Sequence, residues 1–393
     1  MDEVSASLRC GRSGIVFDQE RQRAGFRSSL TGRINDFAPE RYGLSRKSLR
    51  TMCEPAQYAY AAAAAAIDDA NVTPELRQSG RCGIIFGNDS CVKPAVESID
   101  TLREKGETHF IGSGHIFRTM NSTVTMNLAV ALGVRGANWT ISAACASGAH
   151  AIGQALLLIR SGLQDIVITG GAQETNWQSM ASFDALGAFS TRHDQPEKAS
   201  RPFDSQRDGL VPSGGAACLV IEELSHALAR NARVYAVVGG YGFASDGSEH
   251  LFNPSKRGAA DAMKMALADA AVSPDRIDYI NAHATSTPVG DQVEATAIAE
   301  VFGTSVPVSS TKSMTGHECW MAGASEVLYT TVMARDGFIA PNINFVKAAD
   351  DCPKIRIVSS TEVSPMSMAL SNSFGFGGTN ASLVLDFGQR SEV

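Results

Sequence analysis

Short apolar runs alternate along the whole chain with longer segments in which apolar residues recur at helical spacing. The short runs predict buried strands, among them Cys82–Phe86, Ala217–Glu222, Val234–Gly242 and Ala381–Leu385. The longer segments predict helices, among them Pro55–Asn71, Gly258–Val272, Asp291–Phe302 and Ala322–Arg335. Such an alternation is typical of the α/β class. No linker, low-complexity tract or charge block divides the chain, so we expect one compact unit.

Composition narrows the class of protein further. The 393 residues are 44% hydrophobic, enough for a large core, yet no apolar run reaches membrane-spanning length and no signal peptide precedes the chain. We therefore expect a cytoplasmic protein that is not in the membrane. Eight cysteines without a Cys-x-x-Cys pair indicate reduced thiols, with neither a disulfide framework nor a structural metal site. A formal charge of −7 argues against nucleic-acid binding.

Cys145 is the strongest candidate for chemistry. It follows a short apolar strand beginning at Trp139, in a turn of small residues that opens an apolar helix, Ala149–Ser161. A second strand, Asp165–Gly171, returns after that helix. A sulfur at a helix N-terminus faces unpaired N–H groups and the positive end of the helix dipole, which favour the thiolate. A buried structural cysteine is the alternative for Cys145 taken alone.

Three further motifs favour a catalytic role of Cys145 over a structural one. His283 ends a predicted strand and is followed by a polar turn, and His317 closes the segment Val308–His317, ahead of a small-residue helix. Near the C-terminus, Asn372–Asn380 contains a Gly-Phe-Gly-Gly turn around Phe376. Each histidine alone favours a structural role. In this order, however, the motifs closely resemble those of the β-ketoacyl-ACP synthases, the Cys-His-His condensing enzymes of the thiolase superfamily.

The resemblance extends from about Asp2 to Asp386. It is closest to the type I synthases, whose motifs are similar to Ser7–Ile15, Glu197–Asp204 and His226–Arg230. It implies a five-layered αβαβα fold of two similar halves, residues 1–235 with the cysteine and 236–393 with the histidines. A homodimer is implied, and a heterodimer stays open. Family members begin with a strand that is missing here, and we expect its place to lie inside the sheet of the first half.

The resemblance also implies an activity, the decarboxylative Claisen condensation of an acyl-enzyme with malonyl-ACP in fatty-acid elongation. Cys145 would accept the acyl chain. His283 and His317 would donate hydrogen bonds to the malonyl thioester carbonyl as it becomes an enolate. The backbone N–H groups of Cys145 and Phe376 would form the oxyanion hole, and Phe376 would gate the acyl pocket. No cofactor is expected beyond the phosphopantetheine of the acyl carrier protein.

Supporting roles follow from the same resemblance. Lys312 and Glu326 match a buried ion pair behind His317, for which a purely structural role is the alternative. Thr285 and Thr287 match positions that bind pantetheine. Two acidic residues match positions of structural support, namely Asp291 and Glu294.

A basic run indicates the partner. Arg46, Lys47 and Arg50 place three positive charges within five residues, and Arg46 and Arg50 share one face of a helix. The run resembles a docking patch for the acidic acyl carrier protein, and Arg118 matches a second docking cation on the other side. A solvated surface face is the alternative.

Several residues depart from the family pattern. Trp320 stands in place of a glycine after His317, and Ala284 in place of a glycine after His283. Asn121, Thr123 and Thr125 are polar for the lining of an alkyl pocket, and are explained equally well by hydrogen bonds across a dimer. The second function kept open is therefore a specialised polyketide or aryl-polyene ketosynthase, paired with a chain-length-factor-like partner.

Other members of the superfamily fit less well. A degradative thiolase needs a second cysteine in the C-terminal glycine-rich loop, and Ser371–Asn380 contains none. A non-catalytic chain-length partner would lack the nucleophile, and an acyltransferase that never condenses would not need both histidines.

Overall fold

Two mixed sheets form the frame of the protein, described here from a computed structural model that covers the chain except residues 249–250, 252–253, 351 and 389–393. The first sheet has the order β4-β3-β5-β6, from β3 (Cys82–Gly87), β4 (Asn138–Ile141), β5 (Ile166–Gln173) and β6 (Gly215–Glu222). The second has the order β11-β9-β8-β13-β14-β7, from β7 (Val237–Ser245), β8 (Tyr279–Asn281), β9 (Pro307–Ser309), β11 (Arg356–Ile357), β13 (Met368–Gly375) and β14 (Thr379–Asp386).

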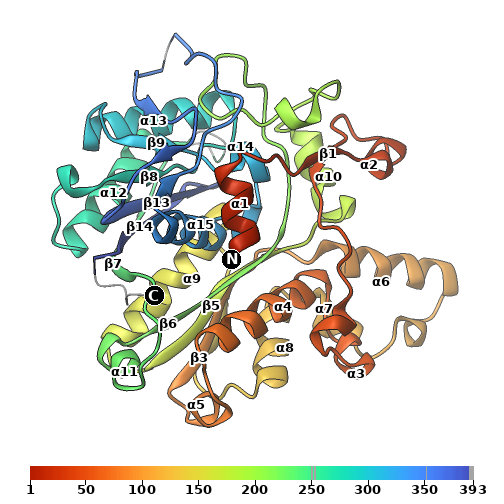
Figure 1. Cartoon of the computed structure of the whole chain (residues 1–393). Coiled ribbons are helices and arrows are strands. Elements are labelled where there is room, and N and C mark those ends of the chain that lie inside the picture. Colours follow the sequence, from red (N-terminus) through yellow and green to blue (C-terminus); the bar gives the residue numbers. More distant parts are fainter. Residues whose placement is uncertain (249–250, 252–253, 351, 389–393) are drawn as a thin grey trace.

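Helices complete five layers (Figure 1). Between the sheets lie α9 (Ser147–Arg160), which contacts β5, β3 and β14, and α15 (Ala322–Asp336), which contacts β13, β6 and β5. The outer face of the first sheet is covered by α4 (Glu54–Asp69) and α8 (Thr123–Leu132). The outer helices of the second half are α12 (Lys256–Asp269), packed on β7 and β14, and α13 (Pro288–Phe302), packed on α12. The predicted α/β class and αβαβα architecture are confirmed.

The two central helices are buried because nearly every face of each is apolar or small. Buried positions of α9 include alanines, isoleucines and glycines around the whole helix, a pattern typical of a helix inside a core. Gly153 is required for close packing, since a β-carbon there would lie 2.4 Å from the Tyr241 ring. The predicted helices and strands are present, with ends that differ by a few residues.

The sheets repeat one pairing pattern. In the first, β4, β3 and β5 are parallel and β6 is antiparallel to β5; in the second, β9, β8 and β13 are parallel and β14 is antiparallel to β13. The second sheet also has β7 beyond β14, as its edge. The corresponding place in the first sheet is the free edge of β6. We expected the first strand of family members to have its place inside the first sheet. That expectation was wrong, because the repeat puts the corresponding position at the edge of this sheet, beside β6.

The remaining elements lie around these layers. They are α1 (Asp2–Arg9), which packs on α15, β1 (Ile15–Phe17), α2 (Gln19–Arg23), β2 (Leu30–Gly32), α3 (Arg46–Leu49), α5 (Pro74–Gln78), α6 (Val92–Lys105), α7 (His115–Thr119), α10 (Trp177–Leu186), α11 (Leu224–Ala229), α14 (Lys312–Thr315), β10 (Phe338–Ile339) and β12 (Glu362–Val363). Short 3₁₀ turns include η3 (Ala144–Ala146) and η6 (Cys319–Met321). Among the described residues, no helix is both long and apolar enough to cross a membrane. Among the described residues, no disulfide bond joins any of the eight cysteines.

Candidate active site

Cys145 lies between the end of β4 and the start of α9, as the sequence predicts. The turn is tightly held. Ala144 takes a left-handed conformation with φ 46°, rare for a residue with a β-carbon, and its N–H donates to Asp89 Oδ2 at 3.0 Å. The Ser147 hydroxyl donates to the Ala144 carbonyl at 2.6 Å and accepts from the Ala143 N–H at 2.9 Å. These bonds fix the sulfur beside the first turn of α9.

Phe376 is brought to this sulfur by the hairpin of β13 and β14. The turn between these strands contains Gly377 and Gly378, with φ 81° and 79°, a conformation that favours glycine. Gly375 lets the hairpin approach the cysteine turn, since a β-carbon there would lie 2.9 Å from the Ala143 carbonyl oxygen. The backbone N–H of Phe376 donates toward the Cys145 sulfur. The predicted oxyanion-hole groups are thus neighbours.

His283 follows β8, and its backbone is clamped by one carboxylate. Glu294 on α13 accepts from the His283 N–H at 2.9 Å and from the Ala284 N–H at 2.6 Å. Asn372 Nδ2 donates to the same carboxylate at 3.1 Å. Asp291, one turn earlier, accepts from the N–H groups of Phe203 and Thr287. Both carboxylates therefore hold backbone N–H groups near His283, an arrangement that agrees with the supporting role predicted for Glu294 and Asp291.

His317 lies closest to the sulfur. Its backbone pairs with the segment before β6, donating to the Val211 carbonyl at 2.7 Å and accepting from the Ser213 N–H at 2.9 Å. Its Nε2 is 3.0 Å from Cys145 Sγ. The rings of His283 and His317 lie edge to face with centroids 5.3 Å apart. One potential ligand atom from each of the three residues lies within 4.8 Å of the others.

Burial sets the protonation of these groups. It raises the pKa of the Cys145 thiol to about 12, against the lowering effect of the Phe376 N–H and the Lys312 charge. Desolvation of the sulfur thus opposes the helix terminus, which by itself favours the thiolate. Burial, followed by the Lys312 charge, lowers the pKa of His283 and His317 well below 6.5. Both imidazoles are neutral at physiological pH.

Lys312 and Glu326 form the predicted buried pair. Both side chains are fully buried, and the lysine ammonium donates to Glu326 Oε1. Burial raises the pKa of Glu326 to about 8, against the lowering effect of Lys312. A second buried carboxylate, Glu318, accepts hydrogen bonds from Ser325 and Tyr329 at 2.7 Å each. The pair lies close enough to influence both histidines electrostatically without a direct hydrogen bond to either among the described residues.

The predicted pantetheine-binding threonines lie together beyond His283. The hydroxyl oxygens of Thr285 and Thr287 are 3.2 Å apart, and Thr285 is buried. They lie at the start of α13, on the same stretch of chain as the Glu294 clamp.

The basic run is exposed on and after α3. Arg46, Lys47 and Arg50 have no ion-pair partner among the described residues. Arg118 on α7 is less free, since its guanidinium lies 3.9 Å from the Glu97 carboxylate. A β-carbon on Gly114, just before α7, would lie 2.5 Å from the Arg50 carbonyl oxygen. Within one chain, α3 and α7 are therefore neighbours (Figure 1), so Arg118 and the basic run belong to adjacent elements.

The polar residues of α8 are satisfied inside the chain. Thr125 Oγ1 is 2.9 Å from Thr140 Oγ1, and the Thr123 hydroxyl oxygen accepts from the side-chain amide of Asn127 at 3.3 Å. Asn121 donates to the Asp89 carbonyl at 2.9 Å. These contacts account for their polarity without a polar substrate.

Trp320 lies in η6 and joins an apolar group around the sulfur. We call this group the Trp320 cluster; it contains Cys145, Met180, Phe183, Phe189, Leu210, Cys319 and Trp320. The indole N–H of Trp320 donates to Ser90 Oγ at 3.1 Å. This bulky residue therefore fills the space beside Cys145.

Sequence reasoning missed the loop after β3. Asp89 supports the Cys145 turn and Ser90 holds Trp320, yet neither lies in a recognised motif. One signal was present: Asn88-Asp89-Ser90 directly follows a buried strand of a largely parallel sheet, and polar residues at such strand ends gather at sites.

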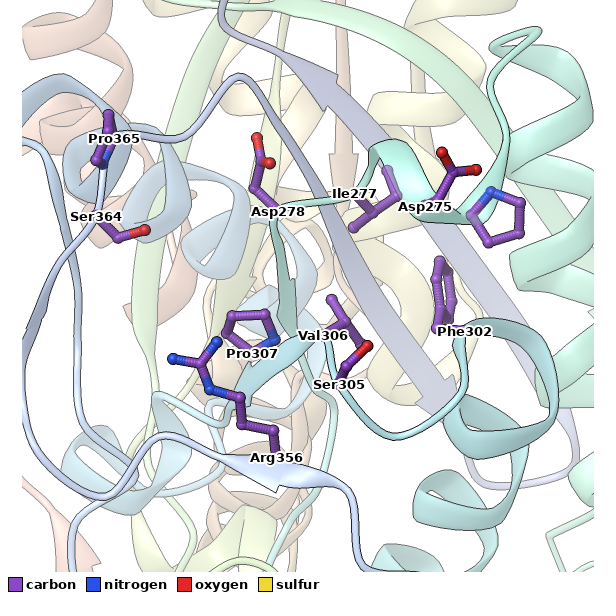
Figure 2. Close-up of a pocket in the computed structure, with 11 residues that line it drawn as sticks. Asp275, Ile277, Asp278, Phe302, Ser305, Val306, Pro307, Arg356, Ser364 and Pro365 are labelled. Atoms are coloured by element: carbon purple, nitrogen blue, oxygen red, sulfur yellow. The ribbon is translucent and has the colours of Figure 1, made fainter.

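A separate hollow lies away from this chemistry. Figure 2 shows a pocket of about 710 Å³ near the start of β8 and β9, lined by Asp278, Pro307 and Arg356 among others. His283 follows the opposite end of β8. Asp278 accepts from the backbone of Ser367 at 2.7 Å, so its charge is used within the fold. We assign no role to this pocket.

Known proteins share this arrangement. Residues 2–227 match the N-terminal domain of β-ketoacyl synthases, and residues 235–346 match their C-terminal domain. The chain is 44% identical over 388 residues to 3-oxoacyl-[acyl-carrier-protein] synthase 1 of Escherichia coli (strain K12), which covers 98% of this chain and 94% of that protein.

Solved structures agree. A β-ketoacyl synthase from Burkholderia phymatum STM815 has a TM-score of 0.93 and 35% identity, covering 100% of this chain and 95% of that one. A type II polyketide acyl carrier protein in complex with its ketosynthase, bound to the hexaketide, has a TM-score of 0.87 and 29% identity, covering 98% and 94%.

Fold and site together define a thiolase-like enzyme with a buried Cys-His-His centre. The chain belongs to the β-ketoacyl synthase family. It is an acyltransferase, and its function is that of a 3-oxoacyl synthase of fatty-acid elongation, the first of our predictions. The specialised polyketide or aryl-polyene alternative is not better supported.

Proposed function

We propose that Cys145, His283, His317 and the Phe376 N–H carry out both half-reactions. The observation that carries this is the 3.0 Å separation of His317 Nε2 and Cys145 Sγ, with the Phe376 N–H directed at the same sulfur. In the first half-reaction, the sulfur attacks the thioester carbonyl of an acyl-ACP. The backbone N–H groups of Cys145 and Phe376 stabilise the oxyanion, and the thiol proton ends on the departing pantetheine sulfur.

The second half-reaction uses the histidines. Malonyl-ACP loses CO2, and the developing enolate oxygen accepts hydrogen bonds from the Nε2–H groups of His283 and His317. The enolate carbon attacks the acyl carbonyl, a carbon–carbon bond forms, and the carbon–sulfur bond to Cys145 breaks. The released thiolate takes up a proton. Neutral imidazoles suit this role because each keeps one ring N–H, which can donate a hydrogen bond to the enolate oxygen as its charge develops.

No cofactor is needed for these steps, since both substrates arrive as activated thioesters. Cys145, His283 and His317 would fit a metal ion by their spacing. We assign the thiol to acyl transfer instead, because a metal-bound sulfur could not attack a thioester freely. The direct test is mass analysis of products from acyl-ACP and malonyl-ACP. A β-ketoacyl-ACP two carbons longer than the donor supports the proposal, and unchanged substrates contradict it.

Lys312 gives a prediction for pH dependence. Its positive charge helps to lower the pKa of both histidines, so their neutral form persists into acid. Lys312→Met removes that charge and should raise both histidine pKa values toward 6.5. Decarboxylation requires neutral histidines and is lost as pH falls through their pKa, so its acid limb should move up by about one pH unit. Lys312→Arg, which keeps the charge, is the control. Coincident acid limbs in Lys312→Met and the unchanged protein would contradict the electrostatic role.

We propose that the partner is an acyl carrier protein, which docks on the exposed cations of the basic run. The carrier proteins that such enzymes use present acidic helices, and a cationic surface accelerates encounter with them. Exchange of Arg46, Lys47 and Arg50 for glutamate should raise KM for acyl-ACP by about tenfold at low salt and less at high salt. Acylation from acyl-CoA should be nearly unaffected. The control exchanges Lys256 and Arg257, exposed cations on α12, for glutamate. Equal losses with both donors would indicate damage to the site instead.

We further propose a homodimer formed through β4. This strand pairs with β3 on one side and has no partner on the other among the described residues. Trp139 on β4 and Met120 nearby are 42% and 44% exposed, and they line a depression of about 680 Å³ with Thr125. Open edges of this kind pair with another chain. Sedimentation should give twice the 41.5 kDa chain mass. A particle of one chain contradicts the dimer, and a second, different chain in the native complex indicates a heterodimer. The cysteines form no disulfide among the described residues, which supports our proposed placement in the cytoplasm.

A further inference from the structure

The acyl group on Cys145 needs an apolar space, and the surroundings of the sulfur leave one direction for it. His317 lies on one side of the sulfur, and the Phe376 N–H and the start of α9 occupy others. The histidine side is polar and suits the malonyl group. The apolar side is the Trp320 cluster. An alkyl chain attached to Cys145 is therefore directed into this cluster, where burial of its methylenes among apolar side chains is favourable.

The cluster is filled in this conformation. Cys145 is 4% exposed and Trp320 is 6% exposed. The Phe183 ring lies 6.1 Å from Trp320, 6.3 Å from Phe189 and 6.0 Å from Phe376, measured between centroids. Such distances are those of aromatic rings in contact. No alkyl chain fits between these rings unless one of them moves.

Trp320 is the largest side chain of the cluster, and its position is fixed. Its indole N–H donates to Ser90 in the loop after β3, so the ring spans from η6 in the second half to a loop of the first half. Its backbone is also held tightly: a β-carbon on Gly148 would lie 3.1 Å, and one on Gly171 2.9 Å, from the Trp320 carbonyl oxygen. The indole can leave its place by side-chain rotation, which breaks the bond to Ser90.

We propose that Trp320, held by Ser90, limits the length of the acyl chain that Cys145 accepts, so that this enzyme elongates short acyl groups in preference to long ones. The inference rests on the assignment of Cys145 as the acyl acceptor. Each methylene that a filled pocket must reject changes kcat/KM by on the order of 10- to 200-fold. Trp320 is thus a specificity-determining residue, and the substrate class is a short acyl thioester.

The experiment measures kcat/KM for acyl transfer to Cys145 from butyryl-, octanoyl-, lauroyl- and palmitoyl-ACP, with intact mass confirming the acyl-enzyme. The unchanged protein should favour butyryl over palmitoyl by more than roughly tenfold. Trp320→Ala should raise the palmitoyl-to-butyryl ratio by at least roughly tenfold, and Trp320→Phe and Ser90→Ala should raise it less. The ratio is read within each variant, so a general loss of activity does not affect it.

Controls separate the outcomes. Trp177→Ala removes an indole on α10 that is not a member of the Trp320 cluster. It bonds to Glu20 and contacts Phe26, a ring that packs against the cluster, at 6.3 Å between centroids, and its loss should leave the ratio unchanged. Equal transfer of all four chains to the unchanged protein, or an unchanged ratio in Trp320→Ala, overturns the proposal. If Trp320→Ala does not fold, as judged by its melting transition, unchanged ratios in Trp320→Phe and Ser90→Ala overturn it. Absence of acyl-enzyme from every donor would contradict the role of Cys145 itself.

Discussion

Cys145→Ala protein should form neither acyl-enzyme nor β-ketoacyl-ACP, with condensation reduced on the order of 10⁴- to 10⁶-fold, as when an enzyme loses its nucleophile. The sulfur lies at the meeting point of His317 Nε2 and the Phe376 N–H, and methyl hydrogens cannot replace it. Intact-mass analysis and product analysis after incubation with acyl-ACP and malonyl-ACP provide the measurement. Continued formation of β-ketoacyl-ACP by this variant would show that another group accepts the acyl chain.

Cys145→Gln separates the two half-reactions. The glutamine amide is similar in shape and polarity to an acylated cysteine, and its carbonyl oxygen can accept from the N–H groups of residue 145 and Phe376. Both histidines remain, so malonyl-ACP should still lose CO2 although no condensation follows. Release of CO2 from labelled malonyl-ACP is the measurement, with Cys145→Ala for comparison. Loss of decarboxylation in Cys145→Gln would mean that the sulfur itself takes part in that step.

His283→Ala and His317→Ala should each lower malonyl-ACP decarboxylation by on the order of 10²-fold or more, the usual effect of removing one preorganised donor. Both rings are buried and neutral, so each donates where the enolate charge develops. Acyl transfer should suffer less in His283→Ala than in His317→Ala, because Nε2 of His317 is the ring atom 3.0 Å from the sulfur. Rates of CO2 release and of acylation, measured separately, test this difference.

Two controls accompany the histidine variants. His226→Ala removes a partly exposed histidine on α11 that pairs with Glu222 at the end of β6, away from the sulfur. It should change neither rate. Melting temperatures identify losses caused by the cavity that alanine leaves in a buried site. Equal losses of acylation and decarboxylation in both active-site variants would remove the distinction between the two histidines.

The proposed chemistry of this protein could be predicted from local sequence motifs. A cysteine in a small-residue turn, two histidines at strand ends and a Gly-Phe-Gly-Gly turn are features of short segments, so their identity and order are present in the chain itself. The secondary structure was predictable for the same reason. The helices around residues 55–69 and 322–335 and the strands around 82–86 and 381–385 have strong apolar patterns, which depend on neighbours in sequence.

Quantities that depend on distant neighbours were not predictable. The helix terminus beside Cys145 predicted an easily ionised thiol, yet burial raises its pKa to about 12, because desolvation depends on every element packed around the sulfur. The polar Thr123 and Thr125 suggested a special substrate or a dimer contact, and their partners proved to lie within the chain.

The sequence by itself therefore identified the groups that we propose to react, since the proposed nucleophile, donors and oxyanion-hole turn each belong to one continuous segment. Only the tertiary structure decided how these groups are arranged. It placed β6 at one edge of the first sheet among the described residues, because sheet order follows from pairing between distant segments. It also showed where Trp320 goes. A tryptophan after His317 has no defined direction in sequence, but packing against Phe183 and a hydrogen bond to Ser90, 230 residues away, hold it beside the sulfur.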